Sequence, residues 1–383
     1  MLKKWSLQKI AGIFLLLFVF AVIGKPEPAE AVAAEKIQLN RDYVVQFEDS
    51  YDSLLYEFTV PEAGNISVQM KDTNPAGSYE MQLQLFDDNN LMLASKREYS
   101  ANLELPVYST DGNRSFYLKL IGDYGAYGTS YVFTVNFDPN TDWESEDNNT
   151  TASADVISAG KDWYGAINDS NDPCDYFKFR LGASKKVTIK FGPKEVSGNS
   201  NSWDVELIDS SNQSQKISDD SGTIQTYTCY LKKGTYYLKI TERYNSKNVP
   251  YAISYRESSL DLSAPRISSM KLVAYTDWIP FVDTPCVGIS NVKIKYSGDA
   301  TGYMLKVAKK KSMKGKLTEG RIDFDDKNTK KQVEVPAYLP VVKTYYVQAR
   351  SYVTDPFGVR MYGSYGAVKS VSLNDSLYRK LKR

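Results

Sequence analysis

One polar stretch of the sequence, WESEDNNTTASADV at residues 143–156, gathers side chains that could bind a metal ion. In an extended chain, alternate side chains share one face. Glu144, Glu146 and Asn148 would therefore point the same way, with Asn149 next to them. Carboxylate and amide oxygens arranged like this make half of a shell for a hard cation.

A second acidic group follows in NDPCDYF, where Asp172 and Asp175 flank a turn that Pro173 fixes. Calcium takes about 6–8 oxygen ligands from carboxylates, amides and carbonyls. A rigid turn that faces an acidic strand suits this ion, so we expect a structural Ca²⁺ site. The alternative for the same residues is a solvated linker between two domains, with acids that bind nothing.

The composition excludes several kinds of catalysis. The chain has no histidine, which removes Ser-His-Asp and Cys-His mechanisms and every zinc site that uses histidine. Its three cysteines are too few for a disulfide scaffold, although Cys174 and Cys229 could pair. Carboxylate-only or Ser-Lys chemistry remains, beside no chemistry at all.

The first residues predict export. Lys3, Lys4 and Lys9 precede an apolar run at 10–24 that is too short to span a bilayer comfortably, and Ala33 ends a small-residue cleavage site. We interpret 1–34 as a secretory signal peptide. The mature chain is then expected to be secreted and extracellular, with association to the cell surface left open and no membrane span after cleavage.

Charge is unevenly distributed along the mature chain. Residues 35–259 carry 21 Lys and Arg against 33 Asp and Glu, whereas residues 260–383 carry 22 against 11. The acidic part suits calcium, and the basic part suits an anionic surface. Alternatively, both charges only keep the protein soluble. The basic run AKKKSMKGK at 308–316 lacks interleaved aromatic residues, so no nucleic acid partner is expected.

Short alternating runs such as LLYEFTV and YEMQLQLF predict an all-β chain of sandwich type. The run DSLLYEFTVPEAGNISVQM at 52–70 matches DYFKFRLGASKKVTIKF at 175–191 in its apolar positions. Two copies of one β domain are therefore predicted at 35–137 and 138–258. Residues 264–373 read as the strands of another sandwich, and 374–383 as a frayed basic tail.

The second copy resembles the bacterial pre-peptidase C-terminal domain, whose relatives include the collagen-binding domains of clostridial collagenases. Its E-x-E-x-N-N, D-x-x-D-Y-F and G-x-Y-Y-L elements follow the order and spacing of that family, and residues 35–137 look like a diverged copy. The resemblance implies jelly-roll-type β-sandwiches, which are usually appended to secreted enzymes and are not catalytic themselves. The third domain resembles a fibronectin type III module through the spacing of Leu339 and Tyr345, which implies an immunoglobulin-like sandwich.

The resemblance also implies a calcium-ligand set, because the same motif positions hold calcium in the collagenase domains. Carried over, the set is Glu144, Glu146, Asn148, Asn149, Asp172, Asp175 and the carbonyl of Tyr176. Asn149 stands where those domains often have Asp, which implies weaker binding.

Two further comparisons limit what the resemblance implies. The first copy has Leu54 and Leu55 opposite Asp175 and Tyr176, so no calcium is expected there. The stripe through which collagenase domains contact collagen is replaced by Lys239, Thr241 and Arg243, so collagen binding is not implied.

These observations predict a secreted or cell-surface, non-catalytic, multi-domain binding or adhesion protein in which calcium orders the inter-domain segment. Its partner would be an extracellular protein or polysaccharide, or an anionic cell-wall polymer that binds the basic C-terminal domain. The alternative is an accessory or targeting subunit of a secreted peptidase or glycosidase. A carboxylate-dependent hydrolase is disfavoured, because no segment of catalytic-domain size remains and metal binding already explains Glu144 and Glu146.

Overall fold

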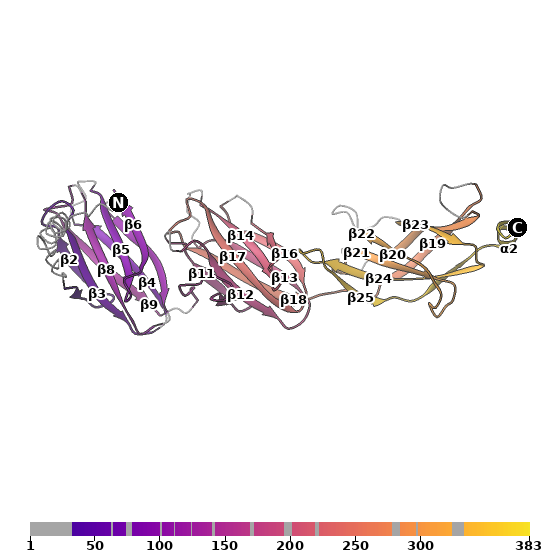
Figure 1. Ribbon diagram of the computed structural model, residues 1–383, viewed down its shortest axis with the longest axis horizontal. Helices are drawn as coiled ribbons and strands as arrows, with labels where there is room; N and C mark the ends of the chain where they lie inside the picture. Colours follow the sequence, from indigo (N-terminus) through magenta and orange to yellow (C-terminus); the bar gives the residue numbers. More distant parts are fainter. Residues whose placement is uncertain are drawn as a thin grey trace, which may run out of the picture. The chain divides into compact units, whose positions relative to one another are not determined.

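The computed structural model describes residues 33–62, 64–73, 79–99, 102–110, 112–123, 125–139, 142–168, 172–194, 201–218, 222–277, 284–295, 298–323 and 333–383 (Figure 1). Every described element is a strand except the short helix α2 (Asp375–Leu381), which confirms the all-β prediction. Nearly all of the predicted signal peptide falls outside the described residues. None of the described helices is long and apolar enough to cross a membrane.

The first repeat forms two antiparallel-rich sheets. One has the order β1 (Glu35–Lys36), β3 (Ser53–Val60), β8 (Arg114–Gly122), β5 (Met81–Asp87) and β6 (Met92–Glu98). The other has the order β2 (Asp42–Gln46), β9 (Ser130–Asp138), β4 (Gly64–Asp72) and β7 (Asn102–Thr110).

The second repeat has the same arrangement. Its first sheet runs β10 (Asp155–Val156), β12 (Asp175–Leu181), β17 (Gly234–Tyr244), β14 (Ser202–Asp209) and β15 (Ser214–Lys216). Its second sheet runs β11 (Asp162–Gly165), β18 (Tyr251–Ser259), β13 (Lys185–Pro193) and β16 (Gln225–Leu231).

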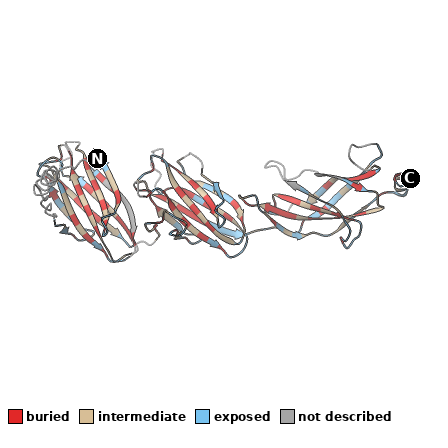
Figure 2. Cartoon of the chain, in the orientation of Figure 1, coloured by how far each residue is buried: buried red, intermediate tan, exposed pale blue. Residues whose placement is uncertain are grey.

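Strand by strand, the two repeats match. In both, a short edge strand pairs in parallel with the next strand, β1 with β3 and β10 with β12. The aligned apolar residues alternate inward and are buried, so each pair of sheets encloses a core (Figure 2). The internal repeat read from the residue pattern is therefore confirmed.

By compactness the chain divides into two units rather than three. One consists of Met1–Pro61, Gln69–Leu103 and Asn113–Val135, and the other of the remaining residues. The division passes through β4 and β7, so it does not follow the repeat, and the predicted domain boundaries stay predictions.

The third group of strands also forms two sheets. One has the order β19 (Arg266–Tyr275), β20 (Cys286–Lys295) and β23 (Val333–Pro340). The other has the order β22 (Lys316–Asp323), β21 (Gly302–Ala308), β24 (Thr344–Thr354) and β25 (Arg360–Tyr365), with β26 (Lys369–Ser372) also paired to β24.

The Leu339 and Tyr345 spacing builds a tyrosine corner. Both side chains are buried, and the Tyr345 hydroxyl donates to the Pro340 carbonyl at 2.9 Å and accepts from the Val342 amide at 3.2 Å. Such a corner fastens the start of a strand to the preceding loop. The fibronectin type III assignment itself stays a prediction.

Two expectations differ from the structure. The predicted frayed tail is instead helix α2. Its residues Leu377, Tyr378 and Leu381 pack into the hydrophobic core between the two sheets of the third group of strands, here called the third core. Cys174 and Cys229 do not pair: each is a free, buried cysteine, as is Cys286.

Candidate metal centre

Residues 142–149 lead into the second repeat as an irregular segment. Trp143 forms a single parallel bridge with Tyr164, and the Glu144 amide donates to the Tyr164 carbonyl at 2.9 Å. No strand follows, so the expectation that strand alternation aligns Glu144, Glu146 and Asn148 is wrong. A bend brings them together instead, and the Asn148 side-chain amide reaches back to Glu144 Oε2 at 3.2 Å.

The other half of the centre lies at the turn before β12. Asp172 Oδ2 accepts from the Asn168 amide at 2.7 Å. The Asn148 carbonyl accepts from the Tyr176 amide at 3.0 Å, which joins the entry segment to the start of β12. Asp175, the first residue of β12, points inward.

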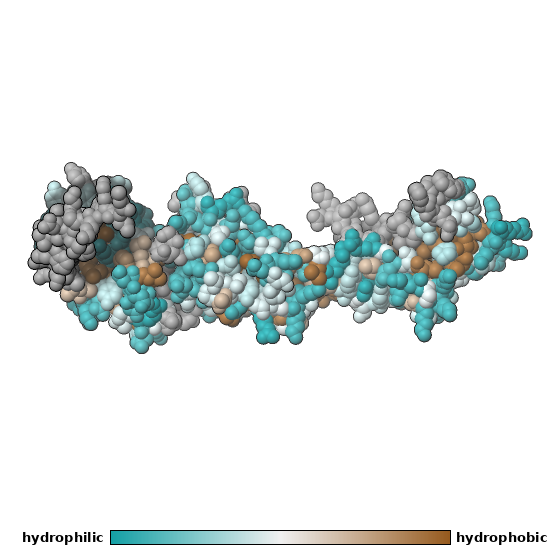
Figure 3. Space-filling view, in the orientation of Figure 1, coloured by the Kyte–Doolittle hydropathy of each residue, from teal (hydrophilic) through white to brown (hydrophobic). Residues whose placement is uncertain are grey.

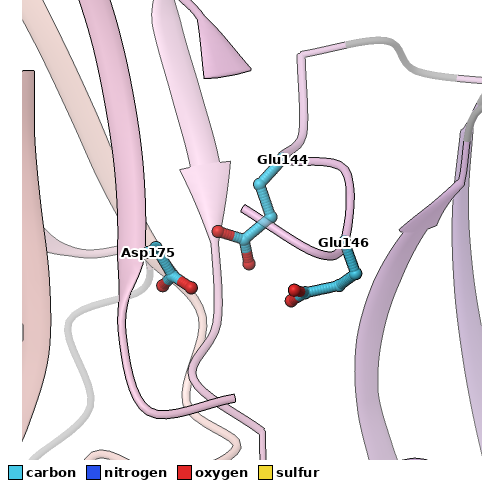
Figure 4. A group of neighbouring side chains, drawn as sticks. All are labelled: Glu144, Glu146 and Asp175. Atoms are coloured by element: carbon cyan, nitrogen blue, oxygen red, sulfur yellow. The ribbon is translucent and has the colours of Figure 1, made fainter. Parts of the chain in front are cut away.

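Three carboxyl groups meet between these two halves. Oxygens of Glu144, Glu146 and Asp175 lie within 4.8 Å of one another (Figure 4). Glu144 is 3% exposed and Asp175 is fully buried. Among the described residues, no lysine or arginine forms an ion pair with any of the three, so their charges lack a cationic partner.

Tyr251 of β18 closes one side of the cluster. Its hydroxyl contacts Glu144 Oε2 at 3.0 Å and also Asp175 Oδ2. A phenol carries one proton and can donate it to only one of these oxygens. The second contact therefore requires a proton on a carboxyl group or a cation nearby.

Glycine at position 165 makes this approach possible. A Cβ there would lie 2.3 Å from the Tyr251 hydroxyl and 2.4 Å from Glu144 Oε2. The following amide, that of Ala166, donates to Glu144 Oε1 at 2.6 Å. The end of β11 thus holds the Glu144 carboxylate in place.

Several buried oxygens around the cluster receive no hydrogen bond within the described part of the chain. They are Glu146 Oε1, Asn148 Oδ1, Asn168 Oδ1 and Asp175 Oδ1. A buried acceptor without a donor is costly. Oxygens of this kind around one point are the ligands that a hard cation such as Ca²⁺ takes, so the residues present fit calcium.

The electrostatics indicate the same need for positive charge. Burial, followed by the charge of Asp175, raises the pKa of Glu144 well above its usual value. Burial and the charge of Asp172 raise the pKa of both Glu146 and Asp175. Burial and Asp175 also raise the pKa of Tyr251.

The structure thus brings together most of the predicted ligand set. Glu144, Glu146 and Asp175 form the cluster, Asn148 is bonded to Glu144, and the charge of Asp172 acts on its acids. For Asn149 and Tyr176 the structure shows other contacts. The Asn149 carbonyl accepts from Cys174 Sγ at 3.7 Å, and the Tyr176 ring lies under the Lys239 ammonium at 5.9 Å. Their roles as ligands stay predictions.

Sequence reasoning missed Tyr251, Asn168 and Asp155. Asp155 Oδ2 accepts from the Ser145 amide at 2.9 Å and from Asn148 at 3.1 Å, which fixes the bend. Tyr251 was open to detection, because it aligns with Tyr131 in the first repeat. Nothing local in the sequence marks Asn168.

The first repeat shows the same position without acids. Strands β3 and β8 of the first repeat pair as β12 and β17 do in the second. Leu54 lies opposite Leu120 and Asp175 lies opposite Ile240, so Leu54 occupies the position equivalent to Asp175. Tyr131, the counterpart of Tyr251, donates instead to the Ala126 carbonyl at 3.3 Å. The sandwich therefore folds without these carboxylates, which are particular to the second copy.

Comparison with known proteins gives fold-level likeness. No protein-family model and no curated protein matches the chain. Among solved structures, the pre-peptidase C-terminal domain of collagenase from Bacillus anthracis is 19% identical over 27% of this chain and 94% of its own, with a TM-score of 0.23. A CUB1-EGF-CUB2 fragment of human MASP-1/3 is 9% identical over 57% of this chain and 100% of its own, with a TM-score of 0.18.

A tandem CBM22 pair from Paenibacillus barcinonensis is also similar, at 11% identity over 57% of this chain and 86% of its own, with a TM-score of 0.18. Likenesses this distant concern the β-sandwich fold and carry no argument about the site.

Gly165→Ala tests the packing of the centre. The added methyl group must displace the Tyr251 hydroxyl or the Glu144 carboxylate, so we expect a loss of roughly 1–3 kcal/mol in the free energy of unfolding, measured by urea denaturation. Gly182→Ala is the matched control, because a Cβ there meets nothing within 4 Å. Equal stability of the two variants would contradict the described contacts.

The pH dependence of stability tests the buried charges. Folding raises the pKa values of these carboxyl groups, so the metal-free folded state is more stable when they are protonated. Their contribution to the free energy of unfolding is therefore greatest below about pH 4, the usual pKa of a carboxyl group in the unfolded chain. That stability is lost as pH rises through the raised values. Chelator-treated protein should therefore melt at a lower temperature at about pH 8 than at about pH 5, and Asp175→Asn should flatten the trend. Rising stability over this interval would contradict the account.

Proposed function

We propose that the chain is a secreted, non-catalytic binding protein whose second sandwich is ordered by Ca²⁺. The observation that carries the proposal is the buried cluster of Glu144, Glu146 and Asp175, held within 4.8 Å without a cationic side chain. Burying unpaired carboxylates costs several kcal/mol for each ion. A divalent cation offsets that cost, whereas no basic side chain in the described part of the chain pairs with these carboxylates.

The burial of the cluster supports a structural role over a catalytic one. A general acid or nucleophile must reach the reacting atoms of a substrate, yet Asp175 is fully buried and Glu144 nearly so. The same burial suits an ion that stays in place. Glu144 and Glu146 act here as ligands that neutralise and position the cation.

Calcium would supply positive charge to two segments that meet at the site. Glu144, Glu146 and Asn148 come from the segment between the repeats, and Asp175 comes from β12. With the ion bound, the bend at 144–149 is held against β12, and the existing bond between the Asn148 carbonyl and the Tyr176 amide is reinforced. Without it, the carboxylates repel one another and the bend is loosened.

The remaining parts of the proposal rest on sequence. The resemblance to pre-peptidase C-terminal and fibronectin type III modules supports a role in binding an extracellular protein or polysaccharide. The apolar run near the N-terminus supports secretion. On this proposal the calcium-ordered segment acts as a brace between modules that present binding surfaces.

Calorimetry of the mature chain with and without calcium tests whether the ion stabilises the second sandwich. For a site with Kd near 10⁻⁴–10⁻³ M, about 10 mM calcium should stabilise the fold by roughly 1.5–2.5 kcal/mol and raise its melting temperature by several degrees. Asp175→Asn should remove the shift. Asp162→Asn, an exposed acid of the same sandwich, should keep it.

Other outcomes would overturn parts of the proposal. An unchanged melting temperature in calcium, or an equal shift in the Asp175 and Asp162 variants, contradicts the calcium site. Hydrolysis of a peptide or glycan library by the purified chain contradicts the non-catalytic role.

A further inference from the structure

Two basic segments that are far apart in the sequence lie at the same end of the third group of strands. The first is the loop 309–315 between β21 and β22, and the second is helix α2. Ala308 ends β21 opposite Tyr346 of β24, and Tyr346 also lies opposite Ser370 of β26. The chain then leaves β26 at this end, where the Leu373 amide donates to the Lys343 carbonyl, and enters α2.

The loop 309–315 is an ordered turn with a buried anchor. Met313 is 9% exposed and adopts a positive φ of 59°, a conformation uncommon for residues other than glycine. Its amide donates to the Lys310 carbonyl at 2.9 Å, and the Lys309 amide donates to the Gly315 carbonyl at 3.2 Å. Burial of the methionine therefore holds the neighbouring lysines in the solvent.

Helix α2 presents its charges through the same kind of anchoring. Leu381 is buried, and Leu377 and Tyr378 pack against the third core. Asn374 caps the helix by accepting from the Leu377 amide at 2.7 Å, and the Lys343 ammonium pairs with Asp375 and lies over the Tyr378 ring. The opposite face is hydrophilic (Figure 3).

The two segments together carry eight cationic side chains at this end of the strands, here named the cationic end. Its members are exposed and form no ion pair with the described residues: Lys309, Lys310, Lys311, Lys314, Arg379, Lys380, Lys382 and Arg383. The described acids at this end are few. Glu319 is paired with Lys316 at 3.4 Å and Asp375 with Lys343, which leaves Asp277 as an exposed acid.

We propose that the cationic end binds a linear, phosphate-bearing polymer outside the cell. Lysine ammonium groups are point charges that suit phosphate oxygens, and binding releases the counterions that condense on such a polymer. Both anchored segments lie at the same end of the strands, so one flexible chain of phosphates can contact both. This inference rests on the proposed extracellular location but not on calcium.

The same surface is poorly suited to two other polyanions. Insertion into a lipid surface needs exposed apolar residues beside the charges, and the apolar residues of α2 and of the loop face the core. Binding of single-stranded nucleic acid uses aromatic residues on which bases stack. The exposed aromatic side chains of this end, Tyr275 and Tyr338, lie on β19 and β23, in the sheet that carries none of these cationic residues.

Binding of the mature chain to long-chain inorganic polyphosphate, measured by fluorescence anisotropy in the presence of chelator, tests the proposal. We expect saturable binding whose affinity falls steeply with salt. Affinity should drop by roughly tenfold or more in a loop variant carrying Lys309→Gln, Lys310→Gln, Lys311→Gln and Lys314→Gln. A helix variant, Arg379→Gln with Lys380→Gln, should weaken binding as well and lower the salt dependence.

A matched control removes as many charges from the other sheet of the third group of strands, away from this end: Arg266→Gln, Lys271→Gln, Lys293→Gln and Lys295→Gln, all exposed in β19 and β20. It should bind like the unaltered chain, with melting temperatures confirming that every variant folds. Equal weakening by the control would overturn the proposal. So would absence of binding, or tighter binding to anionic lipid vesicles or to single-stranded DNA. The chelator keeps these outcomes separate from any failure of the calcium site.

Discussion

The repulsion among carboxylates in the second repeat is the constraint on which the site depends. Glu144 and Asp175 are buried within a few ångströms of Glu146, and burial of such charges is tolerated only with a partner. Every nearby feature holds them there: the amide of Ala166, the hydroxyl of Tyr251, the bend fixed by Asp155 and the space left by Gly165. These contacts hold like charges close together, and a bound cation is what would offset their repulsion.

The internal repeat separates what the fold needs from what the site needs. Both copies share strand order, parallel edge pairing and a buried tyrosine at the same place. In the first copy, Leu54 occupies the position of Asp175 and Tyr131 bonds to a backbone carbonyl. The sandwich thus folds without the acids, and the carboxylate cluster is particular to the copy in which the chain enters through the segment 142–149.

The sequence allowed the sandwiches and most of the site to be predicted, because alternating apolar residues and clustered acids are local patterns. The geometry was not predictable in the same way. Strand alternation selected the correct residues, Glu144, Glu146 and Asn148, but a bend and not a strand makes them converge. Tyr251 and Gly165 join the centre through β18 and β11, pairings that depend on long-range register. Helix α2 was mistaken for a frayed tail because its apolar face is short and its docking surface comes from other strands.

Isothermal titration of calcium into the chelator-treated mature chain at about pH 6 measures the central claim directly. Burial raises the pKa values of the clustered carboxyl groups, so protons and the ion compete for the same oxygens. The account predicts saturable binding at a single site, with Kd on the order of 10⁻⁴–10⁻³ M, and a binding heat that changes with the ionisation enthalpy of the buffer. No saturable heat in any buffer, or binding without proton release, would contradict it.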